Sequence, residues 1–293
     1  MPTDISTKTT NIIFDKEIST EIISKAIDKS AIMQLAQTME IAGNGKKYQT
    51  IEGDPVPEWV GETEPKPIGK FSFGLKEVEP YKLAIIVPFS MEFREDKKAL
   101  YDECVNRLPK LFGPKIDSTV MSITAPGANF DVLGDAQTVS MTPTGNNTLY
   151  DQFVAADELI GTHDGIMSGI ALSPRARSKV LAAKDGQGRP LFTAGVQSGT
   201  INPILGAGVQ VAKGVYAAGS PAKLGLAGDF DNISYGVVKQ ITGSVSDQAT
   251  LTYTEGGETI NLNLWQNNMF AVRFEMRIAV MVRDKNTFVL LTE

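Results

Sequence analysis

The sequence has very little of the residues that usually carry catalysis. It contains one cysteine and one histidine in 293 residues. The single cysteine, Cys104, excludes an intramolecular disulfide, and its apolar neighbours at helical spacing predict a small buried side chain rather than a nucleophile. The single histidine, His163, lies in a glycine-flanked loop and has no second histidine or cysteine nearby, so it makes neither a zinc site nor a serine triad. We therefore predict no catalytic residue, no metal and no cofactor.

Long apolar runs and an excess of basic charge are also absent. No apolar run approaches the roughly 20 residues that span a bilayer, and the first residues lack a signal-peptide pattern. The chain carries 28 basic and 34 acidic residues, which gives a formal net charge of −6 and a pI near 5.1. We expect a protein of a cytoplasm-like compartment that contacts no membrane and is not a dedicated nucleic-acid binder. A mildly acidic wall could still enclose DNA without binding it.

Two short patterns resemble binding sites but lack a required part. The glycines Gly206 and Gly208 follow an apolar run, yet Val211 occupies the third glycine position of a dinucleotide fingerprint, so we interpret them as turn residues. Three carboxylates of one segment could hold calcium or act on a glycoside: Glu58, Glu62 and Glu64. Because that segment is rich in proline, no rigid element fixes their separation, and a solvated or neighbour-pairing acidic arm is the better interpretation.

Hydrophobic residues make up 42% of the chain, which is enough for one large core or two modest ones. The most informative stretch is 54–123. It opens with an apolar and acidic arm whose prolines forbid helix. Residues 71–80 return as a strand, because Phe71, Phe73 and Leu75 alternate with more polar positions. With 46–52 as the outgoing strand, this stretch predicts an extended β-hairpin.

The next elements predict a strand and a long helix. Residues 81–90 form an apolar strand that ends at Ser90, which is well placed to cap a helical segment over 91–96. An amphipathic helix follows over about 97–123. Its apolar residues recur every three or four positions, as on one buried helix face: Leu100, Cys104, Val105, Leu108, Leu111, Phe112, Ile116, Val120 and Ile123.

Three residues interrupt this helix without interrupting its apolar period: Pro109, Gly113 and Pro114. An interior proline removes a backbone hydrogen bond and costs about 3 kcal/mol in a straight helix. The element is therefore predicted to be bent or locally unwound. Two hypotheses stay open: a bend that pivots to fit different curvatures, and two shorter helices that meet at Gly113 at a fixed angle.

The order of these parts resembles the major capsid proteins of tailed bacteriophages with the Hong Kong 97-type fold. The matching segments are the Trp-Val motif at 58–62, the strand at 83–90 and the long helix at 97–123. The resemblance implies an α+β fold with an N-terminal arm, an extended loop, a peripheral domain with a long spine helix and long strands, and an α/β axial domain. It places them as follows: the arm and its helix at 1–45, the extended loop at 46–80, the peripheral domain at 81–126 and 238–286 with a projecting loop at about 254–258, and the axial domain at 127–237 and 287–293.

The rest of the chain agrees with that order of elements. A helical pattern covers 19–39, with an interruption near 28–30, and ends at the glycines 43 and 45. Ser173 is placed to cap a helix, and Pro174 would occupy its first position. Strict alternation over 269–281 predicts a long half-buried strand. The remaining expected elements are a helix at 149–160 and strands at 165–172, 204–211, 223–230, 233–245, 249–254, 259–264 and 287–291.

The apolar content of the hairpin predicts a subunit interface, because an isolated hairpin is barely stable in water. In the resembled shells the extended loop lies on the adjacent subunit, and Trp59 would be a buried anchor of that contact. The alternative is a hairpin that folds back on its own core. The expected interface residues are Val56, Glu58, Trp59, Val60, Glu62, Phe71 and Phe73.

The resemblance implies a structural, non-enzymatic protein that assembles through pentamers and hexamers into an icosahedral phage head around double-stranded DNA. It would be part of the virion and be assembled in the host cytoplasm. Because residue 1 leads directly into the arm, a separate scaffolding protein is expected, with a portal and possible decoration proteins as further partners. An encapsulin-like compartment around a cargo enzyme is the runner-up. A small-molecule binder or enzyme on the α/β segment would require a convergent polar site, and we find none.

Overall fold

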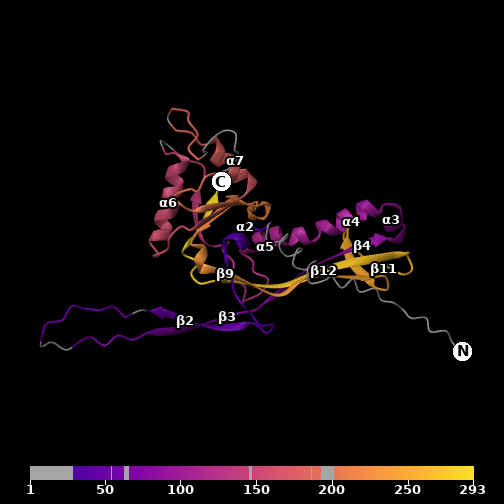
Figure 1. Cartoon of the computed structure of the whole chain (residues 1–293), viewed down its shortest axis with the longest axis horizontal. Helices are drawn as coiled ribbons and strands as arrows, with labels where there is room; N and C mark the ends of the chain where they lie inside the picture. The colour runs from indigo at the N-terminus through magenta and orange to yellow at the C-terminus, as the bar shows by residue number, and fades with distance from the viewer. Residues whose placement is uncertain (1–28, 54, 63–65, 145–146, 186, 193–200) are drawn as a thin grey trace.

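The structure is a computed structural model that describes residues 29–53, 55–62, 66–144, 147–185, 187–192 and 201–293. Two sheets organise these residues (Figure 1), one with the strand order β1-β9-β12-β4 and one with the order β5-β13-β8-β6-β7. Two hairpins project from them: β2–β3, and the pair formed by β10 (Thr250–Glu255) and β11 (Glu258–Asn263). The combination of helices with mixed and antiparallel sheets is the α+β class that the sequence predicts.

The long strand β12 (Met269–Val282) is the centre of the four-stranded sheet. It pairs antiparallel with β4 (Tyr81–Ser90) on one side and with β9 (Ile233–Ser246) on the other. The short strand β1 (Gln37–Thr38) runs parallel to β9 at the far edge. The alternation expected over this strand is confirmed, since one face of β12 is wholly buried: Phe270, Val272, Phe274, Met276 and Ile278.

A series of helical segments covers that face (Figure 1). They are α3 (Met91–Asp96), α4 (Lys98–Arg107), the 3-10 turn η1 (Pro109–Leu111) and α5 (Phe112–Val120). The single helix expected over 97–123 is therefore interrupted, and the interruption lies at Pro109, which has no N–H to donate to the preceding turn. Gly113 and Pro114 lie in the first turn of α5, where a proline is tolerated. The backbone at Leu108 and Phe112 keeps right-handed helical angles, so the helical course continues through the turn.

Two details of the expected helix are wrong. Leu100, Leu111 and Ile123 were placed on the buried face, but their side chains are 51%, 52% and 71% exposed. Leu100 and Leu111 are about three turns apart and therefore share a stripe beside the buried one, while Ile123 follows the end of α5. Ser90 does occupy the N-cap position of α3, but its hydroxyl makes no capping hydrogen bond.

The five-stranded sheet is covered on both faces. It contains β5 (Gln137–Ser140), β13 (Phe288–Thr292), β8 (Lys223–Gly228), β6 (Gly169–Leu172) and β7 (Gly208–Val211). Val289 and Leu291 of β13 face α6 (Leu149–Gly161) and α7 (Pro174–Ala182), whereas Phe288 and Leu290 join the core of the other sheet. Because β13 is buried on both faces, its residues are apolar almost throughout. This explains the continuous apolar run near the C-terminus of the chain. The cap at Ser173 and Pro174 is confirmed, since the Ser173 hydroxyl accepts from the Ala176 N–H at 3.2 Å.

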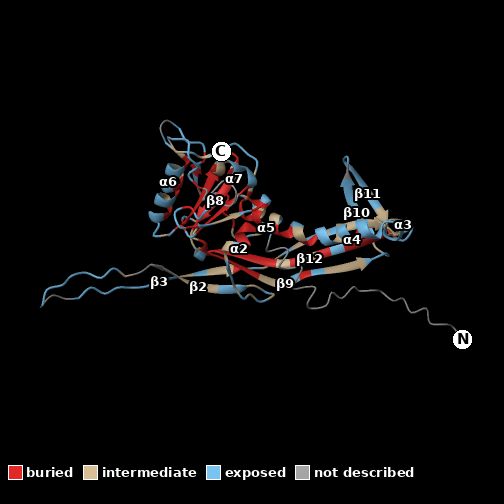
Figure 2. Cartoon of the chain, turned by 45° about the horizontal axis from the view of Figure 1, so that its top comes forward, coloured by how far each residue is buried: buried red, intermediate tan, exposed pale blue. Residues whose placement is uncertain are grey.

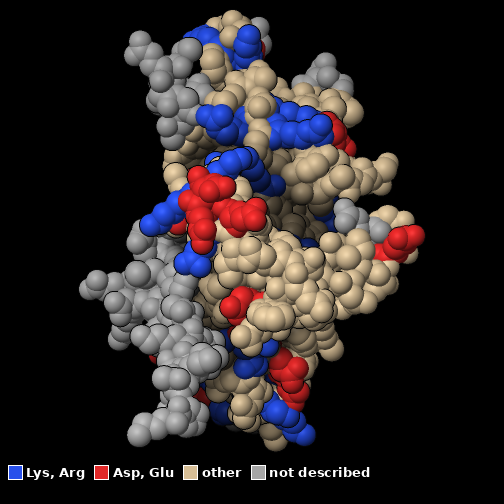
Figure 3. All heavy atoms as spheres, turned by 90° about the vertical axis from the view of Figure 1, so that its right-hand side faces the viewer, with Lys and Arg blue, Asp and Glu red and all other residues tan. Residues whose placement is uncertain are grey.

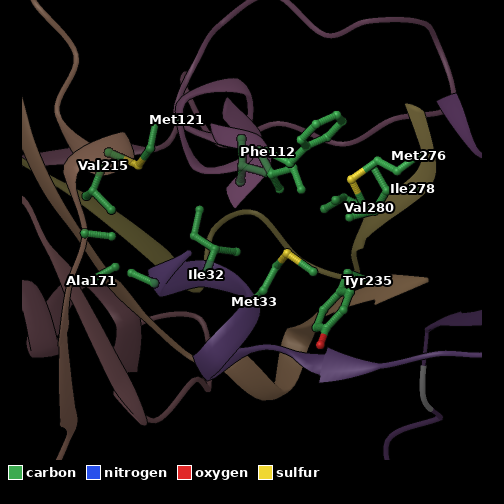
Figure 4. Packing of buried hydrophobic residues seen from close by; sticks show 14 of the residues in the cluster. Ile32, Met33, Phe112, Met121, Ala171, Val215, Tyr235, Met276, Ile278 and Val280 are labelled. Carbon is green, nitrogen blue, oxygen red and sulfur yellow. The ribbon is translucent and has the colours of Figure 1, made fainter. Parts of the chain in front are cut away.

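Near the N-terminus, the helical pattern expected to continue to residue 39 ends early, at Leu35. The helix α2 covers only Ala31–Leu35, and the chain then pairs with β9 as β1. Tertiary strand pairing overrides the helical pattern at 37–39, and the part of that pattern before residue 29 lies outside the described residues. Ile32 and Met33 of α2 point into the core between α5 and the four-stranded sheet (Figure 4).

A buried carboxylate fixes α2 to α5. Asp117 of α5 accepts hydrogen bonds from the Ser30 hydroxyl at 2.6 Å and from the N–H groups of Ala31 at 3.0 Å and Ile32 at 3.2 Å. Burial raises the pKa of the Asp117 carboxyl to about 6, although the three donated hydrogen bonds act in the opposite direction. At neutral pH the charged form is held in place by these donors.

Lys223 of β8 caps the C-terminal end of α5. Its ammonium group donates to the carbonyl oxygens of Met121 at 3.0 Å and Gly134 at 2.7 Å. A cation at a helix C-terminus is favourable because the last carbonyls have no partner within the helix. Gly214 lies so close to Pro114 that a Cβ there would meet the Pro114 carbonyl oxygen at 2.2 Å. These contacts fix α5 to the five-stranded sheet.

Asp117 makes the pH dependence of stability predictable. Its pKa in the folded chain lies above the usual 3.8, so the folded state binds more protons than the unfolded state between about pH 4 and pH 6. The stabilising contribution is present below about pH 4 and is lost as the pH rises through 6. We expect the unfolding free energy of the wild-type subunit minus that of Asp117→Asn to fall by about 2 kcal/mol from pH 4 to pH 7. Urea unfolding of the unassembled subunit measures it, and a difference that stays constant or rises with pH would contradict the assignment.

Candidate subunit interface

The hairpin formed by β2 (Lys46–Gly53) and β3 (Ser72–Val78) leaves the body of the molecule (Figures 1 and 2). The two strands pair antiparallel, with Tyr48 opposite Lys76. Exposure rises steadily away from the body: Val78 is 1% exposed, Leu75 59% and Phe73 71%. The outer part of the hairpin is therefore not covered by the residues of its own chain that the structure describes.

An ion pair and an apolar cluster hold the base of this hairpin. Lys76 lies 2.7 Å from the carboxylate of Asp131, which also accepts the N–H of Val282 at 2.7 Å. Val78 packs with Ala279 and Met281 at the C-terminal end of β12. The direction in which the hairpin leaves the body is thus set by its base. Sequence reasoning missed this ion pair, because the two charges are 55 positions apart and neither lies in a recognisable motif.

The apolar interface residues expected from the sequence are all exposed. On the outgoing side Val56 is 80% exposed, Trp59 104% and Val60 38%. On the returning side Phe71 and Phe73 are 55% and 71% exposed, with ring centroids 6.4 Å apart. The alternative of a hairpin that covers its own core is wrong. Ile68, which is 90% exposed, belongs to the same surface and was missed because it stands alone between prolines and glycine.

The acidic residues of the hairpin tip share this surface. Glu58 and Glu62 are exposed, and no ion pair joins either of them to another residue in the part of the chain that is described. Glu64 lies outside the described residues. The two limbs are kept close near the tip, since a Cβ on Gly69 would meet the Pro55 side chain at 2.3 Å. We call residues 55–62 and 66–71 the hairpin tip.

The other residues considered for catalysis or binding lie outside the hairpin. His163 is exposed, and its Nε2 lies 3.1 Å from the amide nitrogen of Gln137. Leu205 and Gly206 both have positive φ, at 50° and 84°, and form the tight turn that was expected. Over the described ranges no group of three or more His, Cys, Asp or Glu side chains could hold a metal ion, and no helix there is long and apolar enough to cross a membrane. Cys104 is only half-buried.

A group of charges lies on the face of the four-stranded sheet that the helices leave open. Glu275 of β12 lies 2.5 Å from the ammonium of Lys239, 3.9 Å from that of Lys82 and 3.9 Å from the guanidinium of Arg273. The hydrogen bond from Lys239 and the charges around it lower the pKa of Glu275. We call Lys82, Ile86, Lys239, Arg273 and Glu275 the sheet-face patch. The period-2 pattern placed Arg273 and Glu275 on this face, but their partners come from two other strands and could not be paired from the sequence.

On the end of the molecule opposite the hairpin, basic and acidic side chains are mixed rather than gathered in one field. Seen from the end opposite the hairpin, small groups of basic and acidic side chains alternate over the surface (Figure 3). A nucleic-acid binder would instead present a continuous basic footprint.

Comparison with known proteins gives one consistent result. A model described as the phage capsid family matches residues 11–292. The probable major capsid protein gp17 of Mycobacterium phage D29 is 27% identical over 284 residues, which cover 95% of this chain and 89% of that protein. The major capsid protein of Staphylococcus phage 80alpha is 25% identical over 94% of this chain and 83% of its own length. A solved structure from Gordonia phage Cozz superposes with a TM-score of 0.72 at 19% identity and covers 90% of this chain and 86% of its own.

The exposure of Trp59 predicts the effect of removing its side chain. In the unassembled subunit Trp59→Ala should change the free energy of unfolding by no more than about 0.5 kcal/mol, because the side chain touches no core. The matched control is Phe270→Ala, since Phe270 is 1% exposed and packs against Phe89 and Tyr101. That control should cost about 3–5 kcal/mol. Chemical denaturation of both variants checks the pair, and a large loss in Trp59→Ala would mean that the hairpin tip packs on its own subunit.

Proposed function

The chain belongs to the phage capsid family, and we propose that it is the major capsid protein of a phage head, present in many identical copies. It is a structural component of the phage shell. The relatives that match are phage capsid proteins, which favours a genome-containing shell over an encapsulin-like compartment. Pentamers and hexamers of this chain would close the icosahedral shell around double-stranded DNA.

The observation that carries this proposal is the exposed apolar hairpin. Its anchored base and exposed tip are suited to a contact between copies, because large apolar side chains of the tip such as Trp59 and Ile68 are open to solvent in the described part of the chain. Large aromatic side chains such as Trp59 dominate the energy of protein interfaces. The expected interface set is therefore proposed as a whole: Val56, Glu58, Trp59, Val60, Glu62, Phe71 and Phe73.

The division into domains and the other partners are part of the same proposal. The peripheral domain would contain the four-stranded sheet, the spine helices and the β10–β11 hairpin, and the axial domain would contain the five-stranded sheet with α6 and α7. The boundary expected at 237/238 falls within β9. A scaffolding protein, a portal and possible decoration proteins would take part in assembly in the host cytoplasm. The negative net charge implies that the wall holds DNA without sequence-specific binding, so that a packaging motor supplies the driving force.

The interrupted spine helix is proposed as a pivot. The segment α5 is held by Lys223 and Gly214 on the side of the five-stranded sheet, whereas Tyr101 of α4 packs on the aromatic residues of the four-stranded sheet. The turn at Pro109 lies between these two attachments and has already lost a backbone hydrogen bond. A small change of angle there would let one subunit fit pentamers and hexamers.

The pivot can be checked in a reconstruction that resolves the independent subunits of one shell. The angle between the axes of α4 and α5 should differ between subunits at positions of different curvature, while each segment keeps its contacts with its own sheet. If the angle is the same in all subunits and curvature changes at other joints, the fixed bend is correct and the pivot is not.

Assembly itself is the primary test of the proposed function. Expressed alone or with its scaffold, the chain should form rings or closed shells, seen by light scattering and electron microscopy. Trp59→Ala should prevent assembly and keep the far-UV circular dichroism of the subunit, because the lost contact is worth about 2–4 kcal/mol in each interface. A wild-type chain that stays strictly monomeric at high micromolar concentration, with and without its scaffold, would contradict the proposal.

A further inference from the structure

Residues 30–43 cross from one sheet to the other, and we call them the N-terminal strap. The first part of the strap is α2, which contacts α5 together with β6 and β7 of the five-stranded sheet. The second part pairs with β9 as β1 and then reaches the base of the hairpin, where Met39 and Ile41 pack against the cluster around Val78. The strap is therefore attached to both sheets.

The attachment of α2 is buried and polar. Ser30 and Asp117 are both completely buried, and the Asp117 carboxylate accepts the three hydrogen bonds that hold the start of α2. The Ser30 hydroxyl also accepts the N–H of Met33 at 3.0 Å, so the residue that caps α2 is itself held by α5. Release of α2 would leave a buried carboxylate without its donors, which is strongly unfavourable. The helix α2 therefore moves together with α5.

Two neighbouring side chains of α2 point to different sheets (Figure 4). Ile32 lies on the side of Ala171 in β6, whereas Met33 points toward Tyr235 in β9. Both side chains are buried, with exposed fractions of 2% and 4%. The helix thus fills the space where the two sheets meet, and loss of either side chain would leave a cavity that its neighbours close only in part. The strap separates the sheets as well as joining them.

The attachment to the four-stranded sheet is made mainly by backbone groups. The strand β1 pairs in parallel with the first residues of β9, and both of its residues are exposed. Beyond β1 the N–H of Met39 donates to the carbonyl oxygen of Tyr235 at 2.8 Å. The guanidinium of Arg277 in β12 then donates to the carbonyl oxygen of Gly43, also at 2.8 Å. This half of the strap lies nearer to the surface than α2 does.

A single residue connects the two attachments. The helix α2 ends at Leu35 and β1 begins at Gln37, so only Ala36 lies between them. The backbone of Ala36 is already extended, with φ −75° and ψ 155°, and one residue spans at most about 3.6 Å. The strap has no slack, so a change in the angle between the sheets requires one of its attachments to open.

We propose that the N-terminal strap restrains the angle between the two sheets, with Asp117 as the latch that holds its helical end. The spine helix connects the same two sheets through the turn at Pro109, and the strap is a second connection that opposes bending there. Because β1 is short and exposed, it is the attachment that opens when the angle changes. The inference rests on the proposed function for its role in a shell, but the restraint is a property of the single chain.

The experiment measures the distance between the two sheets in the unassembled full chain. Spin labels are placed at two exposed positions, Ser178→Cys on α7 and Thr242→Cys on β9, with Cys104→Ser to remove the native thiol. Double electron–electron resonance gives the distribution of the distance between the labels. Insertion of Gly-Ser-Gly after Ala36 keeps both attachments and adds slack, so it should widen this distribution about twofold or more.

Matched controls separate the strap from a general loosening of the chain. The same insertion after Gly256, in the turn between β10 and β11, should leave the width of the distribution unchanged. Asp117→Ala removes the latch and should widen the distribution, whereas Asp151→Ala removes a carboxylate that caps α6 and should not. Circular dichroism and thermal unfolding identify any variant that fails to fold. If Asp117→Ala does so, the insertion after Ala36 still tests the inference.

The same variants have an expected result in assembly. The insertion after Ala36 should give shells with a wider range of diameters in electron micrographs than the wild type, because the angle between the sheets affects the curvature that one subunit fits. The insertion after Gly256 should give shells as uniform as those of the wild type.

Several results would overturn the inference. These are an unchanged width in the folded variant with the insertion after Ala36, an equal widening by the insertion after Gly256, or a widened distribution with shells that stay uniform in diameter. They would leave the proposed function standing, because the wild-type chain would still assemble. Failure of the wild-type chain to assemble would instead contradict the proposed function, and the distance measurement on the single chain does not depend on it.

Discussion

The structure depends on one constraint: an apolar hairpin tip is held away from the core that could cover it. Lys76 and Val78 fix the base of the hairpin to Asp131 and to the end of β12, and the hairpin extends away from the body (Figure 1). Exposed aromatic and branched side chains on a two-stranded ribbon are unfavourable in water. The contact that we propose with a second copy would remove them from solvent, so that the isolated subunit would be an incomplete structure.

The two sheets and the helices between them form the packed body from which the hairpin projects. The sheet around β12 and the helices above it share one core, and α2 is inserted between the two sheets by Asp117. Lys223 and Gly214 bind α5 to the five-stranded sheet, so the two sheets are joined by a helix rather than by a flexible linker. Pro109 is the interruption in that connection, between the part of the helix attached to one sheet and the part attached to the other.

Much of this architecture could be predicted from the sequence, because its elements follow strong periods. The alternation in β12, the hairpin and the capped helix at Pro174 depend on local residue order and are confirmed. Long-range partners were not predictable. The helical pattern expected to continue to residue 39 ends at Leu35 and gives way to strand pairing with β9, and Leu100 and Leu111 lie beside the covered stripe. The Lys76–Asp131 pair and the cations around Glu275 join strands and loops far apart in sequence, and a single sequence contains no signal that pairs them.

The most direct measurement of the central claim is a high-resolution reconstruction of the assembled particle in which Trp59 can be placed. The account predicts that the Trp59 side chain, fully exposed in the single chain, is buried against residues of a different copy, while the ion pair between Lys76 and Asp131 at the hairpin base is kept. A particle in which Trp59 remains open to solvent, or is covered by its own chain, would contradict it.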